Sequence, residues 1–307
     1  MIYIIADINS FRKEVSLNRV TMLLSLTKRD DIRLVYDKHF NYYNICKNDI
    51  IIFFFIRLYF HKSCYLVKDY INFLKPIKVK KYIYIEDFYK TQQIHNFCQY
   101  HQLDNIIYSM KHEGLKNKLL TYNPDYNIYS LHNHFDLSIF PQTIPEKEYD
   151  ILMYGITEKS VYPFRYLLLQ ILKKLCTKYK IKIIPFISYQ KTPYSIVQNH
   201  LYYEISKSYL TVATRSQFDF LIKKYQEIPL SGSMILGNIP SNYSDLFNEN
   251  TIVSIDETMD ENTIVKKIEE SLENKNELLQ KTIQLQQIIR ERFCMENCYK
   301  DLKSIIF

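Results

Sequence analysis

The sequence predicts an α/β protein made of two domains, each with a parallel sheet. Short apolar runs that are typical of buried strands alternate with amphipathic helical runs from the first residues onward. The segment FPQTIPEKEYD (140–150) interrupts this alternation with two prolines and four charged residues, and the alternation restarts directly after it. A chain of 307 residues is also long enough for about two domains of ordinary size.

The first half predicts strands and helices in alternation. Strands are expected in the short apolar runs at 2–6, 32–36, 49–56, 80–86, 105–110 and 127–131. Helices are expected where apolar residues recur every three or four positions, at 18–30, 63–77, 91–103 and near 114–120. Pro76 stops the second of these helices.

The second half repeats the pattern after the linker. Strands are expected at 150–155, 181–187, 209–214, 233–238 and 251–256. Helices are expected at 161–179, before the strand 209–214, and at 218–228, 261–274, 275–294 and 296–307. Pro229 and Gly232 end the helix 218–228, which places Glu227 in its last turn, where the helix dipole disfavours a carboxylate.

Composition excludes several classes of protein. A hydrophobic content of 47% is enough to bury a sizeable core, so global disorder is not expected. The net charge of +7 would suit a nucleic-acid partner, but the lysines are interleaved with acids, which favours a solvated basic surface. The strongest apolar run, 50–56, is far shorter than the roughly 20 residues of a membrane span.

The six cysteines show no paired metal-binding spacing, and several lie in apolar runs. This pattern predicts reduced thiols and a cytoplasmic protein. The apolar run at the N-terminus is too short for the core of a signal peptide. The sequence carries neither a nucleophile-elbow pattern nor a G-x-G-x-x-G dinucleotide fingerprint.

Three segments of the second half have the ingredients of a ligand site, and one of them, the loop GNIPSNYSDLF (237–247), supplies a glycine and polar residues beside a strand end. Gly155 follows a predicted strand, and the next helix carries Arg165 in its first turn. The segment KYQEIPLSGSMILGN (224–238) places Lys224 and Glu227 before a second strand. Ligands of parallel α/β sheets bind outside the carboxyl ends of the strands, against helix N-termini. An ordinary strand–helix turn at Gly155 and a solvated Glu227 remain the alternatives.

The run 224–232, followed by an apolar strand and the loop GNIPSNYSDLF (237–247), resembles the donor-binding segment of GT-B glycosyltransferases of the "glycosyl transferases group 1" set. The segment HNHFDLSIF (132–140) resembles the end of that family's N-terminal domain. YPFR in the helix 161–179 resembles a motif of some of its branches. The resemblance covers about residues 130–260 and is architectural over 1–130.

The resemblance implies two Rossmann-like domains that face each other across a cleft, with the C-terminal helix returning to the first. It implies an acceptor-side domain at 1–146, a nucleotide-sugar-binding domain at 147–290 and a terminal helix at 291–307. It also implies the transfer of a sugar from a nucleotide-sugar donor to an acceptor. The donor is expected to be a UDP-sugar, and the acceptor a glycan, a protein or a small molecule. No cofactor is expected, and the sequence leaves the oligomeric state open.

The resemblance also assigns roles to residues. Glu227 corresponds to the family glutamate that binds the ribose hydroxyls, and Lys224 with Arg165 to the basic pair that binds the diphosphate. Gly155, Arg215 and Gly232 are expected to bind the donor with them. Asp219 stands where many retaining members carry a glutamate seven residues earlier, so this chain has D-x7-E in place of E-x7-E. That departure puts the sugar contact and the retaining mechanism in question.

Two further groups of residues are candidates. Glu86 and Asp87 follow a strand of the first domain, where an acceptor base could lie, although a solvated strand end is the simpler explanation. His132, His134 and Asp136 share the face of a strand and could bind a metal, but no fourth ligand is evident. Because the sequence has no D-x-D pattern, the expected donor site is metal-independent. A non-catalytic glycan-binding or nucleotide-sugar-binding protein and a glycosyltransferase acting on DNA remain the alternatives.

Overall fold

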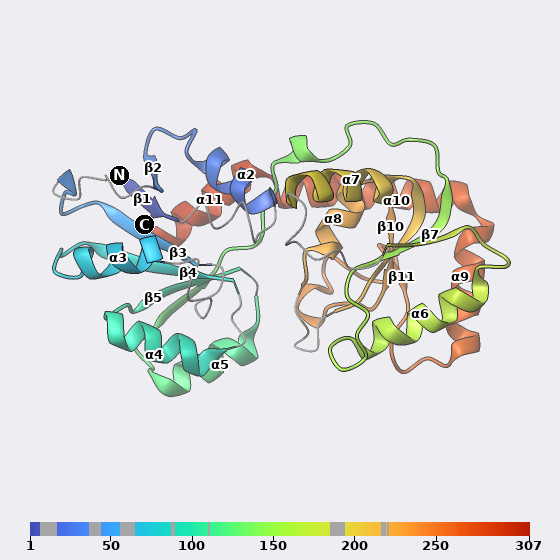
Figure 1. Cartoon of the computed structure of the whole chain (residues 1–307), viewed down its shortest axis with the longest axis horizontal. Coiled ribbons are helices and arrows are strands. Elements are labelled where there is room, and N and C mark those ends of the chain that lie inside the picture. Colours follow the sequence, from blue (N-terminus) through green and yellow to red (C-terminus); the bar gives the residue numbers. More distant parts are fainter. Residues whose placement is uncertain are drawn as a thin grey trace. The chain divides into compact units, whose positions relative to one another are not determined.

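The computed structural model describes residues 1–6, 17–36, 44–55, 65–86, 90–109, 111–184, 194–215, 219 and 221–307. The chain folds into two compact units (Figure 1). The first combines Met1–Asp136 with Phe293–Phe307, and the second is formed by Leu137–Arg292. No helix in these ranges has both the length and the apolar content that a membrane crossing requires.

The first unit contains a six-stranded sheet in the order β2-β1-β3-β4-β5-β6, in which every pair of neighbours is parallel. Its strands are β1 (Ile2–Ile5), β2 (Ile32–Val35), β3 (Ile50–Phe55), β4 (Lys80–Ile85), β5 (Asn105–Tyr108) and β6 (Asn127–Ser130). Its helices are α2 (Leu17–Leu26), α3 (Tyr65–Leu74), α4 (Thr91–His101), α5 (Glu113–Tyr122) and α11 (Met295–Ile306).

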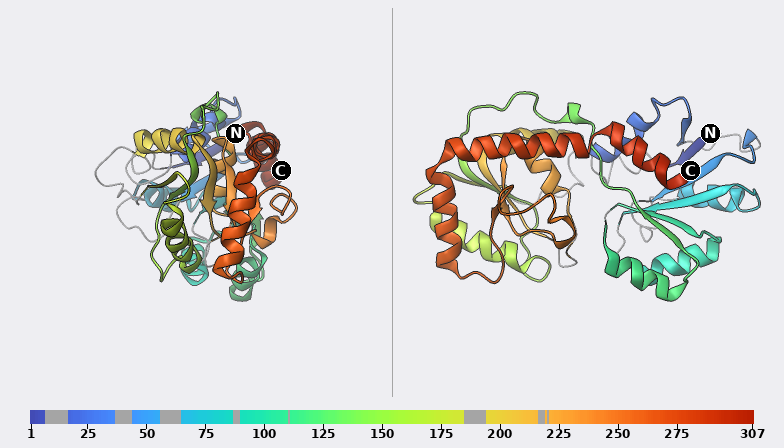
Figure 2. Two further views of the ribbon diagram at one scale, coloured as in Figure 1. Left: turned by 90° about the vertical axis from the view of Figure 1, so that its right-hand side faces the viewer. Right: turned by 180° about the vertical axis from the view of Figure 1, so that it is seen from behind.

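Alternate residues of these strands build two apolar layers, because successive side chains of a strand point to opposite faces of the sheet. Ile5 and Phe53 pack with residues of α3, α4 and α5 on one face. Ile4 and Phe54 pack with α2 and α11 on the other. Figure 2 shows the same two helical layers from behind. The C-terminal helix α11 therefore completes the core of the first unit.

The second unit contains a five-stranded parallel sheet in the order β11-β10-β9-β7-β8. Its strands are β7 (Tyr149–Tyr154), β8 (Ile181–Ile184), β9 (Ser208–Ala213), β10 (Met234–Gly237) and β11 (Val253–Ser254). Its helices are α6 (Pro163–Leu175), α7 (Tyr194–Ser206), α8 (Lys224–Leu230), α9 (Glu261–Glu273) and α10 (Lys275–Arg292). The 3₁₀ turns η2 (Leu137–Ile139) and η3 (Ser241–Tyr243) complete the elements of this unit.

The helices of the second unit form where the apolar spacing predicts them. The buried residues of α9, for example, are Ile264, Ile268 and Leu272, four positions apart along one face. Asp260 caps this helix by accepting a hydrogen bond from the backbone N–H of Thr263 at 2.8 Å. A strand is present in each expected segment, and the expected ends at 56, 110 and 185–187 lie outside the described residues.

One predicted helix is wrong in its extent. Helix α8 begins at Lys224 rather than at 218, and Pro229 lies inside it, one residue before its end. Asp219 has φ +55°, a left-handed conformation that a right-handed helix cannot contain. Glu227 consequently lies at the centre of the seven-residue helix α8, the fourth residue from either end. The helix dipole therefore neither favours nor disfavours its carboxylate.

Candidate functional site

The candidate site lies at the carboxyl edge of the second sheet. Gly155 directly follows β7, Thr214 and Arg215 follow β9, and Asn238 follows β10. The three strands are parallel neighbours, so their ends meet at one edge. This is the edge at which the sequence places a ligand.

Gly155 is the point where two cationic side chains converge. Its φ of +91° is a conformation that glycine adopts without strain. A Cβ added here would lie 3.0 Å from Lys224 Nζ and 3.8 Å from Arg165 Nη1. Lys224 Nζ donates to the backbone oxygen of Tyr154 and lies 3.7 Å from the centroid of the Tyr154 ring. The structure thus brings together three of the residues that the sequence singled out.

Arg165 is almost completely buried, with 3% of its surface exposed. Its Nε donates to Thr214 Oγ1 at 3.1 Å, its Nη2 to the Thr214 carbonyl at 3.4 Å, and its Nη1 to the Ile156 carbonyl at 3.0 Å. The guanidinium also covers the ring of Tyr162 at 4.0 Å. These contacts use three of its five N–H groups and fix its plane. Burial lowers the pKa of Arg165.

The environment of Lys224 is unfavourable for its own charge. Burial of its ammonium and, second, the nearby Arg165 hold the pKa of Lys224 well below its ordinary value, while Glu227 partly offsets them. Two cations side by side in a poorly solvated place repel each other. A bound anion would relieve this repulsion, and a diphosphate is an anion of suitable charge.

Glu227 lies three residues after Lys224 in α8 and is 7% exposed. Its Oε1 accepts a hydrogen bond from the hydroxyl of Tyr202 at 3.0 Å. Tyr202 belongs to α7 and is fully buried, and its ring stacks on Phe140 with centroids 4.5 Å apart. The carboxylate is therefore fixed by a tyrosine that lies far from it in the sequence.

Arg215 and Asp219 belong to a separate polar network after β9 and β10. Arg215 forms ion pairs with Asp219 and with Glu257, and Glu257 is the main cause that raises the pKa of Arg215. Asn238 accepts from the backbone N–H of Arg215 at 2.8 Å and donates to Glu257 at 2.9 Å. The hydroxyl of Ser241 donates to Asp219. Both predicted residues are thus paired with protein groups at this edge.

The structure does not bring Gly232 to the other predicted residues. It precedes β10 and so lies at the amino edge of the sheet, with φ +85°. A Cβ here would lie 2.8 Å from Cγ1 of Ile144. The carbonyl of Gly232 accepts a hydrogen bond from Lys147 Nζ at 2.6 Å. These contacts describe a packed turn beneath the segment that enters β7.

The acceptor-side candidates lie in the first unit. Glu86 is buried at the carboxyl end of β4, and its carbonyl accepts a hydrogen bond from the hydroxyl of Ser109 at 3.3 Å. Asp87 lies outside the described residues. Glu86 is thus placed at the carboxyl edge of its own sheet, as the sequence predicts for a residue that follows a strand.

The His132, His134 and Asp136 segment does not form a metal cluster. The part of the chain that the structure describes contains no group of three or more His, Cys, Asp or Glu side chains that could hold a metal ion. His134 Nδ1 lies 2.8 Å from the carbonyl of His132, and its Nε2 lies 3.3 Å from Asp301 Oδ2 of α11. Asp136 accepts from the hydroxyl of Ser25 at 3.3 Å.

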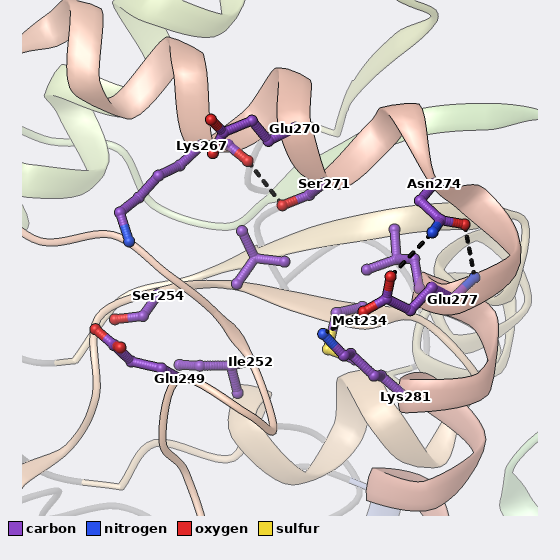
Figure 3. A pocket seen from close by; sticks show the side chains of 12 residues that line it. Met234, Glu249, Ile252, Ser254, Lys267, Glu270, Ser271, Asn274, Glu277 and Lys281 are labelled. Atoms are coloured by element: carbon purple, nitrogen blue, oxygen red, sulfur yellow. Dashed lines mark hydrogen bonds and ion pairs between the residues drawn. The ribbon is translucent and has the colours of Figure 1, made fainter.

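Surface pockets of the second unit lie elsewhere. The one in Figure 3 measures about 320 Å³ and lies between α9, α10 and the start of β10. In its wall, Asn274 Nδ2 donates to Glu277 Oε2 at 2.9 Å, and the Ser271 hydroxyl donates to the Lys267 carbonyl. These polar groups therefore form hydrogen bonds with one another. A second pocket, at the start of β7 and β9, includes Lys147 and Tyr209. Neither includes Gly155, Arg165 or Lys224.

Sequence reasoning missed four residues that shape the site. They are Tyr154, Tyr202, Asn238 and Glu257. Tyr154 and Asn238 stand at the carboxyl ends of predicted strands, and this position was a usable signal. Tyr202 contacts Glu227, 25 positions away, and Glu257 contacts Arg215, 42 positions away. A local sequence pattern cannot predict such pairs.

Comparison with known proteins gives a result at the level of structure only. No protein-family model matches the sequence, and no curated protein matches it. Among solved structures, sucrose-phosphate synthase from Thermosynechococcus elongatus has a TM-score of 0.58 at 7% identity, covering 99% of this chain and 97% of that one. HepE from Anabaena, solved in complex with UDP-glucose, has a TM-score of 0.53 at 7% identity, covering 99% and 98%.

TarM from S. aureus, solved as a variant with UDP, has a TM-score of 0.55 at 13% identity. The match covers 85% of this chain but 56% of TarM, so the chain spans little more than half of that protein. All three are GT-B glycosyltransferases. The chain therefore has the GT-B fold, which confirms the fold expected from the resemblance.

Proposed function

We propose that this chain is a GT-B glycosyltransferase that moves a sugar from a nucleoside-diphosphate sugar, UDP-linked, to an acceptor. The observation that carries the proposal is the convergence of Lys224 Nζ and Arg165 Nη1 on Gly155, at 3.0 and 3.8 Å from the position of a Cβ. The missing side chain lets the Lys224 ammonium lie directly against the backbone of the strand end. Two cations beside it suit the two phosphates of such a donor.

Lys224 and Arg165 act on the leaving group. When the bond between the sugar and the diphosphate breaks, negative charge grows on the oxygen that departs. Positive groups already fixed around that oxygen stabilise the transition state and need no reorganisation at that moment. Arg165 is fixed by its bonds to Thr214 and Ile156. In this proposal the pair supplies the charge that a metal ion supplies in other transferases, so transfer is metal-independent.

Glu227 binds the ribose. An ionised carboxylate only accepts hydrogen bonds and has about four acceptor positions, which suits two adjacent hydroxyl groups. Arg215 and Asp219 lie after β9, at the place where the donor sugar would bind in this proposal. Their ion pair would orient both side chains toward that sugar. Gly232 packs against Ile144 at the amino edge of the sheet and has no donor contact in this proposal.

The solved neighbours support the choice of nucleotide. HepE was solved with UDP-glucose and TarM with UDP. In the proposed arrangement the second unit binds the nucleotide sugar and the first unit binds a glycan, protein or small-molecule acceptor. Glu86, with Asp87, is proposed as the base that removes the proton of the acceptor hydroxyl. The reaction would take place in the cytoplasm.

Titration calorimetry with UDP and uridine tests the proposal. We expect the wild type to bind UDP more tightly than uridine, because only UDP engages Lys224 and Arg165. Incubation with UDP-sugars should release free UDP, which a non-catalytic binding protein would not do. Lys266→Ala is the control for substitutions of Lys224, and it should leave UDP binding unchanged. Lys266 is an exposed lysine of α9 that pairs, among the described residues, only with Glu270 at 3.7 Å. Equal binding of UDP and uridine would contradict the assignment of the diphosphate site.

A further inference from the structure

Tyr202 is a buried side chain beside the proposed site to which the roles above assign nothing. Its hydroxyl lies 3.0 Å from Glu227 Oε1. A carboxylate can only accept, so the tyrosine is the donor of this bond. The bond joins α7 to α8 within the second unit.

We propose that Tyr202 is a positioning residue for the nucleotide: its hydroxyl holds Glu227 in the orientation that accepts the ribose hydroxyls. This inference rests on the proposed function. Glu227 has three rotatable side-chain bonds, and fixing such a side chain only when the ligand arrives costs binding free energy. Tyr202 fixes it in advance and occupies one of about four acceptor positions of the carboxylate.

The tyrosine is itself held in place. It is fully buried, and its ring stacks on that of Phe140 at 4.5 Å with an angle of 27° between the planes. Phe140 follows η2 in the segment that leads into β7, and it is also buried. A ring packed this closely cannot swing away, so the position of the hydroxyl is fixed by the core of the second unit. Phe140 thus holds the ring of Tyr202, and the hydroxyl of Tyr202 holds the carboxylate of Glu227.

The hydroxyl of Tyr202 acts on Glu227 rather than on the packing of its own ring. A carboxylate that is 7% exposed loses most of its hydration, and the bond from Tyr202 replaces part of it. The ring of Tyr202 would pack on Phe140 equally well without its hydroxyl.

The test compares two ligands that differ only in the ribose hydroxyls, UDP and 2′,3′-dideoxy-UDP. The wild type should prefer UDP by about ten- to a hundredfold, since hydrogen bonds to a charged group are among the strong ones. Tyr202→Phe should lower the affinity for UDP about tenfold and leave that for the dideoxy nucleotide within about twofold. The preference between the two ligands should therefore shrink.

A second variant and a control make the result specific. Phe140→Leu keeps the hydroxyl but loosens the ring, so the preference should shrink in the same direction by about threefold. It also serves as the test if Tyr202→Phe does not fold. Tyr82→Phe removes another buried hydroxyl, one that lies in the first unit and donates to the Ile305 carbonyl at 3.3 Å. That control should leave the preference unchanged.

The outcomes separate this inference from the proposed function. If Tyr202→Phe weakens both ligands equally, or weakens neither, the hydroxyl does not position Glu227 and the inference is overturned while the proposed function stands. If the wild type binds UDP without any preference over the dideoxy nucleotide, Glu227 does not bind the ribose and the inference is overturned with that assignment. A wild type that binds neither ligand overturns both the inference and the proposed function.

Discussion

Lys224 and Arg165 meet at Gly155, but their surroundings differ, and so do the expected effects of replacing them. Lys224 combines a lowered pKa with a place beside another cation. Lys224→Met keeps the length of the side chain and removes the charge. We expect UDP affinity to fall at least tenfold with uridine affinity nearly unchanged, and stability to rise by about 1 kcal/mol because a poorly solvated charge is gone. Calorimetry and thermal unfolding check the two effects, and a parallel loss for uridine would contradict the assignment to phosphate.

Arg165 should be sensitive even to a conservative change. Its planar guanidinium donates hydrogen bonds to Thr214 Oγ1, the Thr214 carbonyl and the Ile156 carbonyl at the same time. The ammonium of a lysine cannot reproduce this geometry and would leave buried acceptors without partners. We expect Arg165→Lys to lower the free energy of unfolding by about 2–3 kcal/mol and to weaken UDP binding as well. Chemical denaturation measures the first effect, and an unchanged midpoint would show that the guanidinium is not needed.

Glu227 is held by a hydrogen bond that its sequence position does not reveal. In the last turn of a longer helix, as the sequence suggests, removal of its charge would be neutral or stabilising. At the centre of the short helix α8 the dipole has little effect, and the carboxylate accepts from the Tyr202 hydroxyl. We expect Glu227→Gln to lower stability by about 0.5–1 kcal/mol and UDP affinity by about ten- to a hundredfold. A gain in stability would contradict a stabilising bond from Tyr202, and calorimetry with UDP checks the binding effect.

At the scale of elements, Lys147 joins three parts of the second unit. Its Nζ donates to the carbonyls of Ser206, Ser208 and Gly232 at 2.6–2.9 Å, at the end of α7, the start of β9 and the turn before β10. Burial lowers the pKa of Lys147 to about 8. In the unfolded chain a lysine has a pKa of about 10.4.

This difference predicts a pH effect with a definite sign. Between about pH 8 and 10 the unfolded chain binds the proton more fully than the folded one, so stability rises with pH in that window. Lys147→Met lacks the titrating group. The stability of the wild type relative to the variant should therefore rise by on the order of 2 kcal/mol from pH 7.5 to 10. Urea unfolding at a series of pH values measures it, and a flat difference would show that the lysine stays charged.

The strands could be predicted because buried parallel strands are short, continuous apolar runs, as in 50–56 and 150–155. Gly155, Arg165 and Lys224 could be predicted together because strand ends of such sheets share one edge. The start of α8 could not, since the helical spacing of 218–228 continues across Asp219, which has a left-handed backbone and pairs with the distant Ser241 and with Arg215. The bond between Tyr202 and Glu227 has no local signal at all.

At the scale of the whole molecule, the charge for transfer is proposed to come from the protein itself. In the proposed site Lys224 and Arg165, which converge on Gly155, supply the counter-charge of the diphosphate, and on that proposal activity should not depend on a divalent cation. We expect release of UDP from a UDP-sugar to keep at least half its rate in EDTA. Loss of activity in the chelator, and its return with Mg²⁺ or Mn²⁺, would overturn this assignment.

The first unit is discontinuous, and this has a consequence for its synthesis on the ribosome. The sheet of Met1–Asp136 needs α11, whose Cys298, Leu302 and Ile306 cover Ile4 and Phe54, but α11 is translated only after the whole of the second unit. At about 5–20 residues per second that interval lasts roughly 10–30 s. Throughout it, this apolar face of the nascent sheet is covered by α2 but lacks α11, whereas the second unit has every segment it needs before α11 appears. The second unit can therefore mature first, and the half of the chain that is made earliest is the last to be completed.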